Sequence, residues 1–404
     1  AINNLEPSKL NLVSSRSMSN GFAGMVPGII AVQRSGDPWN NNSDFWIRGI
    51  SSFAGNTQPL VLIDGIERSI NDIDPDEVAS FSVLKDAAAS AVYGVRGANG
   101  VIMVETKRGS IGKPQVSVRF EHALSQPVRI PQYVGSVKYL ELVNEMYSQD
   151  GMAPYVSEAT LRNYRDKTDP ELYPDVNWWD VISKNHADNT RATLSVNGGS
   201  NVLRYALVAG YYNENGILAR DKTKAWDSSL KVDRYTVRSN VDINITSSTI
   251  LRINIGGYLQ SRNAPPGDIS DSRAFYNAMR IPPYIHPAIY ADGKIPRIIN
   301  KDNPWAALTQ RGYERLNHSN VEALTSIEQD LKFVTPGLRL KLTYAFDKFS
   351  ANSVTRAKNP DYYHPATGRD YEGNLITSIQ ANGEDFLGYA KDAKWGNQSV
   401  YVEA

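Results

Sequence analysis

The spacing of hydrophobic and polar residues divides the 404-residue chain into two parts near residue 110. In the first part, short apolar runs are separated by Gly, Pro and Asp, which predicts a small domain of mixed strands and helices. From about residue 115, apolar and polar residues alternate with a period of two, which predicts long strands with two different faces. We therefore expect an α+β domain over residues 1–110 and an antiparallel sheet over residues 111–404.

Within the first part, three apolar runs have the composition of buried strands: residues 58–65, 80–85 and 101–106. Asp74 precedes Pro75 and stands three residues before Glu77, a pattern that is typical of a helix N-terminus. A second short helix is expected over residues 87–93, with Gly94 ending it.

In the second part, tight turns alternate with long connections. The tight turns fall at residues 198–201, 246–249 and 335–337. The long connections lie near residues 126–190, 213–230, 262–319 and 350–395. Tight turns at one end of a sheet and long loops at the other are typical of an outer-membrane β-barrel, with a polar lumen and an apolar exterior. The alternation by itself fits a soluble β-sandwich with one wet face equally well.

About eight strands are expected, and an eight-stranded barrel is filled by its own side chains. Such a barrel could not hold the first domain, so a barrel interpretation requires further strands from outside this chain. The first long connection is expected to contain a helix over residues 136–148. Ser136 would cap it, and Val137, Leu140, Val143 and Tyr147 would share one face.

Composition excludes several classes of protein. The chain has 43 basic and 43 acidic residues, so it lacks the basic surplus of a nucleic-acid-binding protein. Without cysteine it has no disulfide, iron–sulfur cluster or cysteine-based zinc site. No apolar stretch reaches 18 residues, so no transmembrane helix is expected. The mean hydropathy of −0.40 is compatible with a barrel, whose strands alternate between apolar and polar residues.

Motifs for catalysis or for binding a cofactor are weak. The glycines at 94, 97 and 100 do not have the spacing of a phosphate-binding loop. The aspartates at 72, 74 and 76 lack the glycine and the terminal glutamate of a calcium loop, so helix capping explains them better. The five histidines form no HxxxH pair. We expect no catalytic residue, no metal and no cofactor.

The order of short motifs in the first part is more specific than the alternation. In chain order the motifs are GMVPGI (24–29), WIRGISS (46–52), QPLVLIDG (58–65), IDPDEV (73–78), SVLKDA (82–87), AVYGVRGANGVI (91–102) and TKRG (106–109). Over about residues 5–110 this order resembles the plug domain of the SusC/RagA family of TonB-dependent outer-membrane transporters. The resemblance implies a plug inside a barrel of about 22 strands, of which this chain holds about the first eight.

The resemblance also implies a function, which is TonB-dependent import of large nutrients across the outer membrane of Bacteroidetes. Oligosaccharides are the first expectation for the substrate, and peptides are the alternative. Expected partners are a SusD-like surface lipoprotein, TonB through a segment upstream of Ala1, and outer-membrane lipid, but no nucleic acid. A receptor that binds without transport and an outer-membrane enzyme are further alternatives, although no catalytic constellation supports an enzyme.

A polar loop carries the candidate substrate-binding residues Asp37, Trp39, Asn40, Asn41 and Asn42. An indole ring stacks on sugar rings, and Asn and Asp side chains bind sugar hydroxyls. The alternative is an ordinary surface loop.

Candidate polar contacts between plug and barrel are Arg48, Asp64, Glu67, Arg96 and Arg108. These charges are unusual in a small domain with apolar strands. In a polar lumen they would form hydrogen bonds that can be released without exposing a hydrophobic core.

Overall fold

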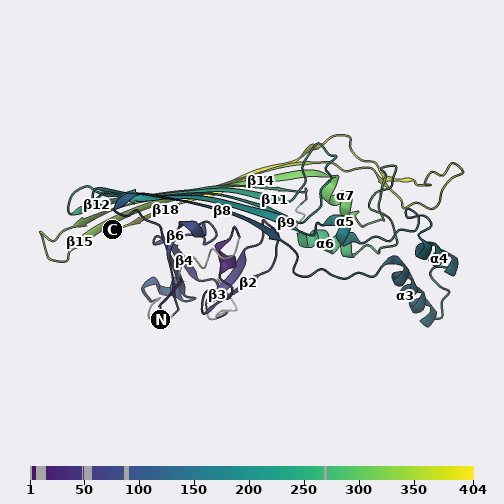
Figure 1. The fold of residues 1–404 in the computed structure, drawn as a ribbon, viewed down its shortest axis with the longest axis horizontal. Coiled ribbons are helices and arrows are strands. Elements are labelled where there is room, and N and C mark those ends of the chain that lie inside the picture. Colours follow the sequence, from purple (N-terminus) through teal and green to yellow (C-terminus); the bar gives the residue numbers. More distant parts are fainter. Residues whose placement is uncertain (1, 6–14, 48, 50–56, 86–90, 268–270) are drawn as a thin grey trace.

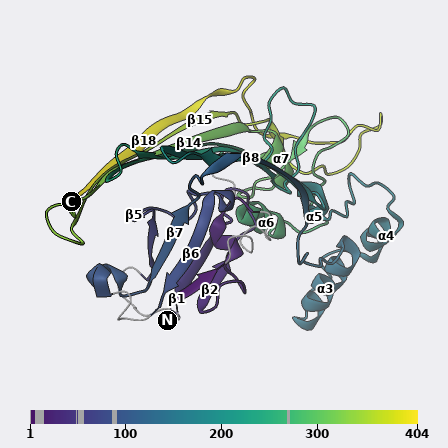
Figure 2. The same cartoon turned by 60° about the vertical axis from the view of Figure 1, so that its left-hand side comes forward.

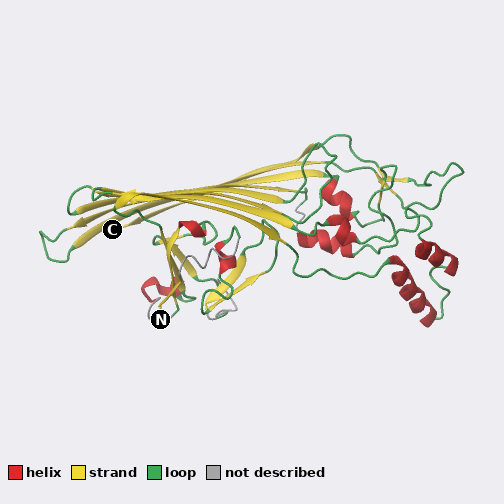
Figure 3. Cartoon of the chain, viewed as in Figure 1, coloured by secondary structure: helices red, strands yellow, loops and turns green. Residues whose placement is uncertain are grey.

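The computed structural model describes all residues except 1, 6–14, 48, 50–56, 86–90 and 268–270. A small α+β unit, which we call the plug, lies under the concave face of a long eight-stranded sheet, which we call the wall (Figures 1 and 2). Helices gather in loops at one end of the wall, and tight turns close its other end (Figure 3). Among the described residues, no helix has the length and apolar character needed to cross a membrane.

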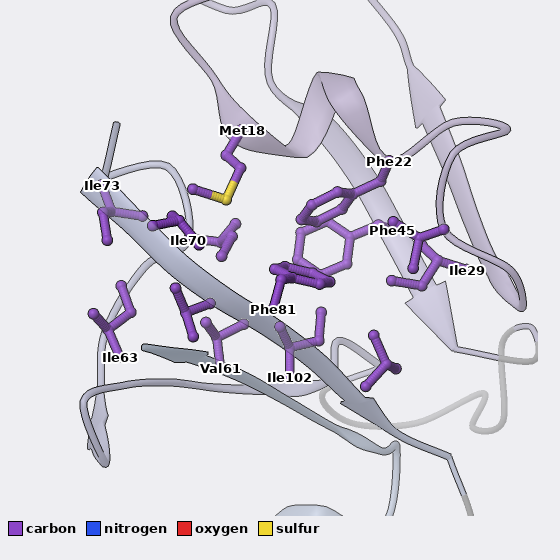
Figure 4. Packing of buried hydrophobic residues seen from close by; sticks show 14 of the residues in the cluster. Met18, Phe22, Ile29, Phe45, Val61, Ile63, Ile70, Ile73, Phe81 and Ile102 are labelled. Carbon is purple, nitrogen blue, oxygen red and sulfur yellow. The ribbon is translucent and has the colours of Figure 1, made fainter. Parts of the chain in front are cut away.

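The plug is built on a five-stranded sheet in the order β1-β6-β7-β4-β5, beside a β2–β3 hairpin. Phe22 lies at the centre of its core, with ring centroids 5.1 Å from Phe45 and 5.3 Å from Phe81 (Figure 4). The strands expected near residues 60, 80 and 101 are confirmed. The elements are β1 Ile2–Leu5, η1 Met18–Gly21, β2 Ile29–Gln33, β3 Ser43–Ile47, β4 Leu60–Ile63, β5 Ile66–Glu67, η2 Pro75–Glu77, β6 Val78–Leu84, η3 Ala91–Gly97 and β7 Val101–Thr106.

The expected plug helices are shorter than predicted. Asp74 does cap, because its Oδ1 accepts a hydrogen bond from the N–H of Asp76 at 2.9 Å. The helix that it begins is only the 3₁₀ turn η2, since β6 starts at Val78. The helix expected over residues 87–93 lies partly outside the described residues. Its described remainder belongs to η3, a 3₁₀ helix interrupted at Gly94, whose φ is 58°.

The wall consists of antiparallel strands joined in chain order. Along β11 the side chains of Arg234, Thr236 and Arg238 are buried toward the plug, and those of Tyr235 and Val237 are exposed on the other face. A polar inner face and an apolar outer face agree with the barrel interpretation. The strands are β8 Gly112–Ser125, β9 Ala187–Gly199, β10 Leu203–Asn215, β11 Lys231–Asn244, β12 Thr249–Ala264, β14 Gly312–Asp330, β15 Arg339–Ala357 and β18 Gly388–Glu403.

The wall strands extend further into the loops than the sequence indicated. The connections predicted over 262–319 and 350–395 shrink to the residues between β12 and β14 and between β15 and β18. In the added stretches most outward positions are polar, so the alternation of apolar and polar residues becomes weak. The backbone pairing continues regardless, as between Asn317 and Asn352.

The loops carry helices and three short strands. The helix expected from residue 136 is confirmed, but Ser136 is its first residue and not its cap. Instead, Oδ1 of Asp175 accepts a hydrogen bond from the Ser136 N–H at 2.7 Å. The elements are α3 Ser136–Gln149, α4 Glu158–Asp166, α5 Trp178–Ile182, α6 Asp271–Met279, β13 Ile295–Pro296, α7 Pro304–Thr309, β16 Tyr362–Tyr363 and β17 Ile379–Ala381.

Candidate functional site between the plug and the wall

The densest polar contact between plug and wall surrounds η2. We call its carboxylates Asp74, Asp76 and Glu77 the acidic turn. The cap at Asp74 and the fixed φ of Pro75 set the conformation of this turn. Each carboxylate binds one guanidinium of the wall: Asp74 binds Arg191 of β9 at 3.1 Å, Asp76 binds Arg119 of β8 at 3.1 Å, and Glu77 binds Arg238 of β11 at 2.7 Å.

An ionic chain continues from the acidic turn across the wall. Nη2 of Arg238 donates to Oε2 of Glu322 on β14 at 2.9 Å. Arg68 of the plug lies 3.6 Å from the same carboxylate and donates two hydrogen bonds, of 2.7 and 2.9 Å, to Asp347 of β15. The side chains at its centre are each 2–3% exposed: Glu77, Arg238 and Glu322. The central part of this series of ion pairs is therefore shielded from bulk water.

The ionic chain from Glu77 to Asp347 contains three carboxylates and two guanidinium groups. Burial raises the pKa of Glu77 to about 7, although the neighbouring Arg238 acts in the opposite direction. Burial likewise raises the pKa of Asp72, just before the acidic turn, to about 6. The interface therefore holds carboxyl groups that titrate near neutral pH.

Wall side chains also bind the plug backbone. Arg234 donates to the carbonyl oxygens of Asn71 and Asp72 at 2.9 and 2.6 Å. Asn240 donates to the carbonyl oxygen of Lys107 at 2.7 Å. These bonds hold main-chain groups near one end of the β6–β7 pair, before the start of β6 and after the end of β7, so they depend on the shape of the plug more than on its side chains.

Two of the sequence-predicted contact residues reach the wall. Nη1 of Arg108 donates to Oδ1 of Asp242 on β11 at 2.9 Å. Asp64 binds mainly inside the plug, where it accepts from the Thr106 hydroxyl at 2.7 Å, and it also accepts from Asn254 of β12 at 3.4 Å.

The other predicted contact residues lie elsewhere. Glu67 and Arg96 form an ion pair with each other, and more than half of each side chain is exposed. Arg48 lies outside the described residues.

The predicted substrate loop is more engaged than an ordinary surface loop. Asp37 is buried, and its carboxylate accepts from the N–H of Trp39 at 2.9 Å. The indole ring of Trp39 is half-buried against the wall. Its centroid lies 4.7 Å from the ring of His318 and 5.7 Å from the guanidinium carbon of Arg262.

The three asparagines of this loop differ in environment. Asn41 is buried and donates to Glu214 of β10 at 2.8 Å, whereas Asn40 and Asn42 are exposed. Asn41 and Glu214 line a cavity of about 500 Å³ between plug and wall, beneath the helical loops. Asn189 lines it too, and its buried Oδ1 has no hydrogen-bond partner among the described residues.

The sequence did not reveal the arginines that hold the acidic turn. They lie on three different strands, and only their inward positions in the alternation marked them. The IDPDEV motif was explained by helix capping, with Glu77 as part of the capping pattern. In the structure Asp74 caps the turn, whereas the carboxylates of Asp76 and Glu77 bind arginines of the wall, which the capping explanation did not predict.

Comparison with known proteins agrees with this architecture. The family described as TonB-dependent Receptor Plug Domain matches residues 1–101. Residues 1–101 are therefore similar to the plug domain of TonB-dependent receptors. Together, the plug and the eight-stranded wall have the fold of a TonB-dependent receptor plug domain with part of its β-barrel.

Relatives in two organisms align with more than half of the chain. TonB-dependent receptor P26 of Formosa agariphila is 28% identical over 277 residues, which cover 66% of this chain and 26% of that protein. TonB-dependent receptor SusC of Bacteroides thetaiotaomicron is 26% identical over 257 residues, covering 60% and 24%. The chain thus spans about a quarter of the length of these relatives.

Solved structures share the fold at low sequence identity. A structure of the RagAB peptide importer in the open-open state matches with a TM-score of 0.72 and 17% identity, over all of this chain and 52% of the other. The siderophore receptor PirA of Acinetobacter baumannii matches with a TM-score of 0.53 and 15% identity, over 99% and 44%.

Proposed function

We propose that this chain provides the plug and the first wall strands of a transporter that imports oligosaccharides across the outer membrane. TonB supplies the work, through a segment outside this chain, and a SusD-like lipoprotein covers the loop side. The observation that carries the proposal is the ionic and hydrogen-bonded attachment of plug to wall. Water can replace such contacts one at a time, so a pull on the plug can detach it while its core stays folded.

The chemistry of the cavity beside Asn41 favours oligosaccharides. Amide and carboxylate groups of Asn41, Asn189 and Glu214 are suited to sugar hydroxyls, and Trp39 is close by in the same loop. We expect Trp39→Ala in the full-length receptor to weaken oligosaccharide binding by about 1–3 kcal/mol in calorimetry, through lost aromatic contact.

Peptides are the second candidate, because the fold is shared with the RagAB peptide importer. Trp226→Ala, in the loop between β10 and β11, is the matched control for the Trp39 variant. Binding of a peptide panel, with no response to any glycan, would reverse the substrate assignment.

The helical loops are the proposed contact for the SusD-like partner. They carry exposed apolar side chains such as Met146 of α3 and Phe386 before β18. A stable lid should bury more than about 2,000 Å² in total. Gentle detergent extraction of the full-length protein with an affinity tag should recover a second subunit, and recovery of the barrel alone at every detergent and salt condition would reject the lid.

Transport and binding are separated by removing the energy source. Cells that carry the full-length gene should take up the substrate, and an uncoupler of the proton gradient should stop uptake while surface binding persists. A deletion strain provides the baseline. Uptake that continues with the uncoupler would indicate passive diffusion through the barrel.

A further inference from the structure

The outer face of the wall changes character along its strands. An apolar band crosses it, with exposed side chains that include Val118 of β8, Ile255 of β12, Val321 of β14 and Val400 of β18. Because paired residues of neighbouring antiparallel strands share a face, the register joins these side chains into one surface. This band is the part of the wall that faces hydrocarbon.

Beyond the band, toward the helical loops, the outward positions of β14, β15 and β18 become mostly polar. Lys348 is the next outward residue after Phe346 on β15 and pairs with Gln398. The following outward rows are Ser319, Ser350 and Gly396, then Asn317, Asn352 and Lys394, then Arg315, Val354 and Asp392. The strands thus continue past the hydrocarbon edge with hydrogen-bonding side chains on their outer face.

The charges on this polar outer face are mostly basic. Lys348, Lys394 and Arg315 are exposed, and none of the three forms an ion pair with another described residue. The one carboxylate in these rows, Asp392, is engaged by Arg356 at 3.1 Å. The surplus of positive charge therefore faces outward and has no counterpart within the described part of the chain.

At the same height on the wall, the strands nearer β8 carry different outward charges. On β11 the first outward charge after the exposed Tyr235 is Asp233. Its carboxylate accepts hydrogen bonds from Tyr211 and Asn213 of β10, at 2.9 and 2.8 Å. Lys231 is the next outward residue on β11, in the row of Arg315, so this strand carries one basic and one acidic side chain where β14, β15 and β18 carry a basic surplus.

We propose that Lys348, Lys394 and Arg315 bind the phosphorylated headgroup of a glycolipid in the outer leaflet. The patch borders the hydrocarbon band on the side of the long loops, which is the outer side, so the acyl chains can lie on the band while the phosphate meets the basic residues. Long basic side chains reach along a surface to headgroup level, and ammonium and guanidinium groups form charge-assisted bonds to phosphate. Ser350, Asn352 and Gln398 supply further hydrogen bonds.

The test uses the full-length receptor in detergent, titrated with diphosphoryl lipid A in mixed micelles and followed by native mass spectrometry. The combined variant Lys348→Gln with Lys394→Gln should bind about thirtyfold more weakly, since each basic residue near an anionic surface contributes about a fivefold factor. Lys332→Gln, in the tight turn at the opposite end of the wall, is the matched control and should bind like the wild type. Heat-modifiable gel migration verifies that each variant is a folded barrel.

Two further arms identify the ligand. Dephosphorylated lipid A should bind the wild-type receptor no more tightly than it binds the double variant. Inorganic phosphate at equal phosphorus concentration should not compete with lipid A for the wild-type receptor. Equal binding of lipid A by wild type and double variant would overturn the proposal. Competition by inorganic phosphate alone would show an anion site that does not recognise lipid. The outcome is independent of transport, because substrate uptake is not measured.

Discussion

The core of the plug and the interface between plug and wall are both buried, but they are built from different chemistry. In the core, Phe22, Phe45 and Phe81 pack ring against ring among aliphatic side chains. At the interface, carboxylates of the acidic turn face guanidinium groups of the wall, and the apolar cluster between the two is limited to Ile66, Leu324 and Ala345 among the described residues.

This difference separates the internal stability of the plug, its cohesion, from the stability of its contact with the wall, its attachment. Apolar burial stabilises the plug internally in proportion to area, and it is lost only when water enters the core. Buried ion pairs contribute little net stability, because desolvation offsets their attraction, yet they are specific in position. The plug is thereby held in one register in the barrel and remains a folded unit if it moves.

Damage to the core should have the largest effect. Phe81→Ala should destabilise the plug by about 4 kcal/mol, since it removes a fully buried aromatic ring and leaves a cavity. Limited thermolysin digestion of the full-length receptor in detergent should then cleave the plug while the wall stays resistant. Unchanged protease resistance would mean that the wall, and not its own core, keeps the plug folded.

Removal of the Arg238 guanidinium should have the second-largest effect. Arg238→Ala leaves Glu77 and Glu322 buried without their shared partner, so attachment should weaken by about 3 kcal/mol. Detachment is measured as urea-dependent labelling of the thiol introduced by Thr193→Cys. Thr193 is buried on the inner face of β9, its hydroxyl has no partner among the described residues, and the chain has no other cysteine.

A combined variant provides the control for this prediction. Arg238→Met together with Glu77→Gln and Glu322→Gln removes the charges with their partner and should recover most of the loss. Thermolysin resistance of the plug should stay at the wild-type level in both variants. If Arg238→Ala exposes the plug to thermolysin at the urea concentration that leaves it attached, attachment and cohesion are not separable.

These partners also show how far the sequence could predict the structure. The two-residue period was enough for the strands and for their faces, because each strand carries the signal locally. The partner of Glu77 could not be found this way, since Arg238 lies far along the chain and their meeting depends on how the plug sits in the barrel. The ends of the strands were not predicted correctly for a related reason. Beyond the hydrocarbon edge, outward residues such as Asn317 and Asn352 are polar, so the alternation of apolar and polar residues no longer marks the strand.

Acidification should strengthen attachment by about 2–3 kcal/mol between pH 8 and pH 5. Burial raises the pKa of Glu77 to about 7, so the attached state binds a proton more readily than the detached state. The stability of attachment therefore falls as pH rises through about 7, and it is highest below the carboxyl group's ordinary pKa. Labelling of the Thr193→Cys thiol across this range measures the slope, which Glu77→Gln should reduce, while the raised pKa of Asp72 retains part of it. Thermolysin resistance of the core should not follow the same slope, because its side chains do not titrate.

The smallest effect is expected where plug and wall share an apolar contact. Ile66 of β5 is nearly buried against Leu324 and Ala345 of the wall. Ile66→Val removes one methyl-sized group from this contact and should weaken attachment by about 1 kcal/mol or less in the urea-dependent labelling assay. Ile73→Val, in the plug core, deletes the same group and serves as the matched control. It should lower protease resistance of the plug and leave labelling unchanged. If Ile66→Val instead weakened attachment as much as Arg238→Ala, apolar packing would be holding the plug in the barrel. A pull on the plug would then have to separate a dry interface in one step, because its contacts could not be exchanged with water one by one.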